Sequence, residues 1–115
     1  MKLPLSPDML RAAYAYLAET APFNKWNMPP AEDVKFKVLR GIREYGDCDK
    51  ATGMVRISSA CHSTTDAVMR TMAHEMVHVF MYHHKIAKRE SEHGRVFWKY
   101  ADQVCAIHGF DRKAF

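Results

Sequence analysis

A helical pattern runs through the stretch from Thr65 to Tyr82. Apolar residues recur there at intervals of three and four, which gives one broad apolar stripe along the helix. Ser63 and Asp66 have the spacing of a capping box at its start. A stripe this broad has to be buried, so the other elements must supply a core that covers it. The apolar positions are Val68, Met69, Met72, Ala73, Met76, Val79 and Phe80.

Two further helices are expected, one before and one after this segment. Ser6 can cap the first, Pro7 suits its first turn, and Pro22 bars it from continuing. The last helix begins at about Gly94 and carries an apolar stripe of its own. Gly109 is well placed to end that helix.

Alternation of apolar and polar residues predicts three short strands between the first two helices. The pattern is clear at residues 34–39 and 54–58 and weaker at residues 42–45. Residues 46–50 form a turn cluster, and residues 23–31 form a connector whose aromatic side chains pack on the core. The predicted fold class is α+β, with a single domain that covers the whole chain.

Composition is that of an ordinary soluble domain. The chain has 115 residues, of which 48% are hydrophobic and 26% charged, so it can bury a core without covalent staples. Cys48, Cys61 and Cys105 are odd in number and widely spaced, which argues against disulfides and against a cysteine metal site. The amino terminus does not resemble a secretory signal, and no apolar run approaches the roughly 18 residues of a membrane span. We therefore expect a cytoplasmic monomer with no membrane partner.

One motif inside the long helical segment carries chemistry. His74-Glu75-Met76-Val77-His78 has the pattern H-E-x-x-H, and residues four apart lie on one helix face. Both imidazoles can therefore point at a common ion, with nitrogen–zinc distances of roughly 2.0–2.1 Å. Glu75 lies about 100° round the helix, which is a suitable position for a general base. Two histidines and one more protein ligand leave a fourth position open, as in catalytic zinc sites.

Three alternatives compete for the third ligand. His84 has the spacing of the extended metzincin pattern, but Met81 stands where that pattern needs a glycine. Glu90 and Glu92 fall in a charged loop and are expected to be solvated. His93 lies at the start of the last helix, next to a glycine that lets the backbone pass close to the site. His93 is the best placed of these.

The two histidine-bearing segments resemble a known family. TMAHEMVHVF followed by ESEHGRVFW looks like the signature of the SprT-like zinc metalloproteases, and the resemblance is strongest over Thr71 to Trp98. The expected order of elements is similar to that family's small zincin domain, of minigluzincin type. The resemblance implies that His74, His78 and His93 bind Zn²⁺ and that Glu75 is the catalytic acid/base.

The same resemblance implies a substrate class. SprT-like proteases act on proteins that are bound or crosslinked to DNA, and DNA stimulates them, which implies a role in DNA–protein crosslink repair. Many of them carry a C-terminal zinc ribbon, and this sequence has no cysteine pairs to build one. A stand-alone protease domain for protein or peptide substrates is therefore expected.

Other residues are candidates for supporting roles. Tyr82, one turn beyond His78, is a candidate donor to the oxyanion of the reaction. Residues 54–59 are a candidate edge strand for pairing with an extended substrate, or are simply part of the sheet. Less constrained oxyanion candidates are His83, His84, Tyr100 and His108.

The clusters of basic residues have two interpretations. They bind DNA weakly, or they are simply a solvated charged surface. The net charge is +4, from 17 basic and 13 acidic residues, which mildly favours anionic partners. The clustered basic residues are Lys35, Lys37, Lys85, Lys88, Arg89, Arg95 and Lys99.

Two functions therefore compete. The first is a zinc endopeptidase. The second is a zinc-stabilised nucleic-acid- or protein-binding module with little or no turnover, in which His84 supplies a fourth ligand. The presence of Glu75 favours the enzyme, because a structural zinc site needs no base.

Overall fold

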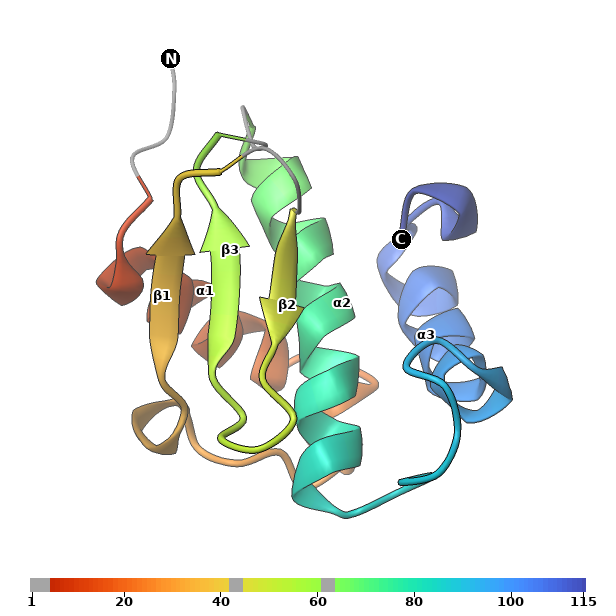
Figure 1. Cartoon of the computed structure of the whole chain (residues 1–115). Helices are drawn as coiled ribbons and strands as arrows, with labels where there is room; N and C mark the ends of the chain where they lie inside the picture. Colours follow the sequence, from red (N-terminus) through yellow and green to blue (C-terminus); the bar gives the residue numbers. More distant parts are fainter. Residues whose placement is uncertain (1–4, 42–44, 61–63) are drawn as a thin grey trace.

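The computed structural model describes residues 5–41, 45–60 and 64–115, and within these ranges the chain forms a small α+β domain (Figure 1). Three α-helices accompany a three-stranded mixed sheet and three short 3-10 helices in this described part. The elements in chain order are α1 (Pro7–Ala18), η1 (Phe23–Lys25), η2 (Ala31–Asp33), β1 (Phe36–Leu39), β2 (Gly46–Cys48), β3 (Val55–Ser58), α2 (Thr65–His83), α3 (Arg95–His108) and η3 (Arg112–Ala114).

The helices begin and end where the sequence signals predict. Ser6 Oγ accepts a hydrogen bond from the backbone N–H of Met9, which caps α1. Gly109 follows α3 with φ +77°, a left-handed conformation that suits glycine. The cap of α2 differs from the prediction, because Thr64 Oγ1 accepts from the N–H of Ala67. Ser63, which was expected to cap this helix, lies outside the described residues.

The second strand is not where the alternation predicted it. Of the expected residues 42–45, only Tyr45 is described, and the strand observed is β2, within the expected turn. The turn comes later, at Asp49, whose side chain accepts hydrogen bonds from the N–H groups of Ala51 and Thr52. Asp47, which looked like a turn residue, is instead held in the strand by Arg56 through two hydrogen bonds of 2.6 Å.

Strand order corrects a second expectation. β3 lies in the centre of the sheet, parallel to β1 and antiparallel to β2. Residues 54–59 therefore do not form an edge strand, because both sides of β3 are already paired. The edge strand nearest α2 is β2 (Figure 1).

The core lies between the sheet and the helices. Figure 1 shows α1 and α2 on the same side of the sheet. Val55 and Ile57 of β3 are fully buried in the core. Tyr14 of α1 meets Phe36 of β1 edge to face, with ring centroids 5.6 Å apart. The predicted stripe of α2 packs in this core, where Met72 and Met76 are fully buried as expected and Met69 is half-buried. Phe23 is fully buried as well.

None of the helices formed by the described residues has the length and apolar character that crossing a membrane requires.

Candidate metal centre

Three imidazoles meet where α2 faces the segment that leads into α3. His74 and His78 lie one turn apart on α2, and His93 comes from the residues just before α3. Nε2 of His93 lies 3.1 Å from Nε2 of His74 and 3.1 Å from Nε2 of His78. The spacing of two nitrogens bound to one tetrahedral zinc ion is about 3.3 Å, so the cluster has the size of such a site.

The hydrogen bonding within the cluster also favours a cation. A single proton on Nε2 of His93 can be donated to only one of its two neighbours. A cation placed among the three nitrogens satisfies all three lone pairs together. The side chains that most often bind metals are His, Cys, Asp and Glu. Among the described residues, these three histidines form a group of such side chains whose ligand atoms all lie within 4.8 Å of one another.

Burial keeps two of these histidines neutral. It lowers the pKa of His74 to about 4 and that of His78 to about 3, and the neighbouring imidazoles add to both shifts. Neutral imidazole is the form that binds metals, so both side chains are ready to act as ligands at neutral pH.

Phe115 orients His74. Its backbone carbonyl accepts a hydrogen bond of 2.6 Å from Nδ1 of His74, and its ring lies 5.1 Å from the imidazole. With the proton on Nδ1, the lone pair of a neutral His74 is on Nε2, which faces the cluster. The sequence offered no local signal for this contact, because the group that accepts the hydrogen bond is a backbone carbonyl.

The segment that carries Phe115 is anchored on α3. Nε of Arg112 lies 2.7 Å from Oδ1 of Asp102, and its guanidinium lies 4.2 Å from the centre of the Trp98 ring. Asp111 caps η3 by accepting from the N–H of Lys113. These contacts hold the end of η3 over α2.

His78 is held by aromatic rings on two sides. Phe97 of α3 stacks on it with ring centroids 4.7 Å apart, and Tyr82 stacks on it at 5.6 Å. His78 itself is 1% exposed. Its ring therefore has little freedom to turn away from the cluster.

Glu75 lies between α2 and β2. The residue is 4% exposed and lines a cavity of about 180 Å³ together with His74, Thr71 and Gly46. A Cβ atom on Gly46 would come within 2.6 Å of the Arg56 carbonyl oxygen and 3.3 Å of Thr71 Cγ2. A side chain at position 46 would therefore clash with the backbone of β3 and crowd Thr71 of α2, so glycine is required there.

The rejected ligand candidates lie apart from the cluster. Nε2 of His84 donates to the carbonyl of Asn27 at 3.0 Å, which removes it as a fourth ligand in this structure. Oε1 of Glu90 accepts from the N–H of Val96 at 3.5 Å, at the start of α3. Glu92 lines a pocket beside His78 and is not among the residues whose ligand atoms lie within 4.8 Å of one another.

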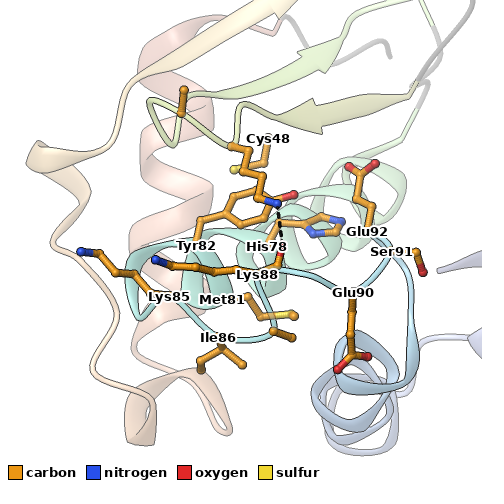
Figure 2. Close-up of a pocket in the computed structure, with 13 residues that line it drawn as sticks. Cys48, His78, Met81, Tyr82, Lys85, Ile86, Lys88, Glu90, Ser91 and Glu92 are labelled. Carbon is orange, nitrogen blue, oxygen red and sulfur yellow. Dashed lines mark hydrogen bonds between the residues drawn. The ribbon is translucent and has the colours of Figure 1, made fainter.

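Tyr82 is the oxyanion candidate that lies at the site. It lines a pocket of about 660 Å³ that begins at His78 (Figure 2). Burial and the nearby Glu92 raise the pKa of Tyr82 to about 12, so its hydroxyl keeps its proton at neutral pH.

The other oxyanion candidates lie elsewhere. Tyr100 packs against Trp26 and Phe80, and Nε2 of His108 lies 3.1 Å from Oγ1 of Thr20. His83 lines a different pocket. Of the clustered basic residues, Lys85 and Lys88 line the same pocket as Tyr82.

We compared the chain with protein-family models, curated proteins and solved structures, and none of them matches it.

Proposed function

We propose that the chain is a zinc-dependent endopeptidase with a small zincin fold of minigluzincin type. One observation carries the proposal. The Nε2 atoms of three histidines converge on one point. Helix α2, which carries two of them, also holds the buried Glu75 beside His74. Structural zinc sites are closed by four protein ligands, whereas three ligands with a neighbouring carboxylate are typical of hydrolytic sites.

The donor set suits zinc. Imidazole nitrogens bind Zn, Cu, Fe and Ni, and three histidines with one open position form a known type of catalytic zinc site. Zinc bound by His74, His78 and His93 would polarise the scissile carbonyl and lower the pKa of the attacking water. His93 is solvent-exposed, so water and substrate can reach the cluster.

The chain's own residues divide the proton work. Glu75 takes the proton of the attacking water and passes it to the leaving amine. Tyr82 remains protonated at neutral pH and donates a hydrogen bond to the oxyanion that develops on the carbonyl. These roles need the carboxylate and the hydroxyl on different sides of the cluster. Glu75 lines the cavity of His74, and Tyr82 lines the pocket of His78, which is consistent with this requirement.

The edge strand β2 is the proposed platform for an extended peptide. Gly46 lines the cavity of His74 and Glu75, and Cys48 lines the pocket of His78 and Tyr82. A peptide paired along the free edge of β2 therefore runs past both histidines of α2. This assigns to β2 the role that was expected of residues 54–59.

The proposed substrates are proteins bound or crosslinked to DNA, as the SprT-like resemblance implies. Lys35 and Lys37 are exposed near β1 and can contribute weak, salt-sensitive contacts to phosphates. Arg56 contributes less to such contacts, because Asp47 already holds its guanidinium.

The test is proteolysis of a DNA-binding protein by the zinc-loaded chain, with and without single-stranded DNA. We expect cleavage by the wild type that DNA stimulates, and a loss of at least about 100-fold in Glu75→Gln with zinc retained. Glu19→Gln, which changes an exposed carboxylate at the end of α1, is the matched control.

The outcomes separate the competing functions. Cleavage that is indifferent to DNA supports a general peptidase and removes the DNA-linked substrate class. One bound zinc with no cleavage of any protein or peptide overturns the proposal and points to a zinc-stabilised binding module.

A further inference from the structure

Most of the residues that line the pocket beside His78 and Tyr82 have no role in the proposed chemistry. The pocket has a volume of about 660 Å³ and lies between the end of α2, the turn after β2 and the loop that leads to His93 (Figure 2). Met81, Ile86 and Ala87 give it an apolar lining. Because His78 also lines it, a side chain seated there belongs to a residue close to the scissile bond.

Charge is divided across this pocket. Figure 2 shows Lys85 and Lys88 on one side and Glu90 and Glu92 on the other. Nζ of Lys50 donates a hydrogen bond of 3.1 Å to the carbonyl of Lys88, which holds a third ammonium group at the pocket.

The two acidic residues are not equivalent. The carboxylate of Glu90 is directed at the start of α3, where Oε1 accepts from the N–H of Val96 and lies 3.3 Å from the position of a Cβ on Gly94. A carboxylate at a helix N-terminus is stabilised there by the free amides. Among the described lining residues, Glu92 is then the carboxylate left to face three ammonium groups.

The three ammonium groups are available. Lys50, Lys85 and Lys88 form no ion pair with any of the residues that the structure describes. The hydrogen bond of Lys50 uses one of three donors, which leaves two for a ligand. The cationic side of the pocket is therefore prepared for an anionic group.

Backbone strain concentrates in the same loop. The N–H of Ile86 donates to the carbonyl of Met81 at 2.8 Å, which ends α2 with Lys85 in a left-handed conformation at φ +57°. Glycine is the usual residue at this position, since a side chain there costs conformational energy. Ala87 has φ +52° as well. The energetic cost of these two conformations has to be offset by the contacts of the surrounding loop.

We propose that this pocket binds an acidic side chain of the peptide substrate, and that it prefers glutamate to glutamine or lysine. The inference rests on the proposed peptidase function. The methylene groups of the glutamate lie against Met81 and Ile86, and its carboxylate meets the ammonium groups of Lys85 and Lys88. Lys50 contributes from the turn after β2.

The test measures binding without turnover. Three fluorescein-labelled peptides, identical except for one position that holds Glu, Gln or Lys, are titrated with zinc-loaded Glu75→Gln protein by fluorescence anisotropy. We expect the Glu peptide to bind about fivefold more tightly than the Gln peptide, since each surface ion pair contributes modestly. Failure of the wild type to cleave would count against the peptidase and leave this preference measurable.

Pocket variants then assign the preference to its residues. In the Glu75→Gln background, Lys85→Gln and Lys88→Gln should each reduce the ratio to about twofold or less, and Lys85→Glu should favour the Lys peptide. Lys25→Gln, on η1, should leave the ratio unchanged. Thermal unfolding of each variant shows whether it remains folded.

Three results overturn the proposal. They are equal affinity for the three peptides, no measurable binding of any of them, and a ratio that the lysine variants do not change. Binding of oligothymidylate to the same variants is measured as well. If Lys85→Gln loses this binding while the three peptides bind alike, the lysines bind a nucleic-acid strand instead.

Discussion

On the His74 side of the histidine cluster the carbonyl of Phe115 lies 2.6 Å from Nδ1 of the imidazole, whereas on the His78 side there is a pocket of about 660 Å³. The first side is filled by η3 and by β2, with a cavity of about 180 Å³ between them. The second side is bordered by a loop with two residues in left-handed conformations, Lys85 and Ala87.

The difference separates two requirements of the proposed hydrolytic site. Ligands must keep one orientation, which hydrogen bonds and packing around them provide. A substrate needs room and groups that discriminate between side chains, which an open pocket provides. Here the first requirement is met around His74 and the second around His78.

Loss of the ligand that both sides share should have the largest effect. His93→Ala removes the nitrogen that lies 3.1 Å from both α2 histidines, so zinc affinity should fall more than about 100-fold. Competition with a chromogenic chelator measures it. His83→Ala, at the end of α2, is the control, and equal affinities of the two variants would refute the three-histidine site.

Acid should weaken the metal-free protein through the buried histidines. His78 has a pKa of about 3 in the folded chain because burial disfavours its charged form, against 6.5 when unfolded. The unfolded chain therefore takes up protons first, and stability declines as pH falls below about 6.5 and is constant above it. At pH 5 the loss for His78 is on the order of 2 kcal/mol.

Urea unfolding in the presence of a chelator at pH 7.5 and pH 5 checks this prediction. His83→Gln should show the same pH dependence as the wild type, because His83 is exposed. An unfolding free energy that is equal at the two pH values would contradict the prediction.

Weakening the anchor of η3 should affect only the closed side. Arg112→Ala removes the contacts with Asp102 and Trp98, so Phe115 should be held less firmly against His74. We expect zinc affinity to fall about tenfold, at the lower end of the range for groups that orient a ligand. The pocket's preference among peptides should not change.

Lys113→Ala is the matched control, because Lys113 is exposed and shares η3 with Arg112. If both variants bind zinc as the wild type does, then η3 does not orient His74.

Relief of strain on the open side should have the smallest effect. Lys85→Gly places glycine at φ +57°, where it is the preferred residue, and should stabilise the fold by about 0.5–1 kcal/mol. Lys88→Gly, at a position without a positive φ, should destabilise it by a similar amount. Urea unfolding measures both, and two losses of equal size would show that Lys85 is not strained.

The helices could be predicted because their determinants are local. The stripe of α2, the cap at Ser6 and the glycine at Gly109 lie within or beside the elements that they define. The sequence spacing of four residues was enough to predict that His74 and His78 lie on one face of α2. His93 was found because the resemblance and the start of α3 placed it in the same region.

The errors and the omissions came from contacts that lie outside the segments they shape. Residues 46–48 resemble a turn, and become β2 because Arg56 binds Asp47 and because β3 pairs with them. The order of the strands was not encoded in any alternation pattern. Phe115 acts through a backbone carbonyl, which every residue type has, so its identity carried no signal.

The hydrogen bond between His74 and Phe115 also has a consequence for the time at which the centre matures. It joins residues 41 positions apart, and at synthesis rates of ~5–20 residues per second this separation takes about 2–8 s to make. Throughout that interval the histidines of α2 already exist, while the carbonyl that orients His74 does not. A chain that has not yet been extended to Phe115 therefore has an incomplete centre, and we expect its tightest metal binding only after Phe115 has been added.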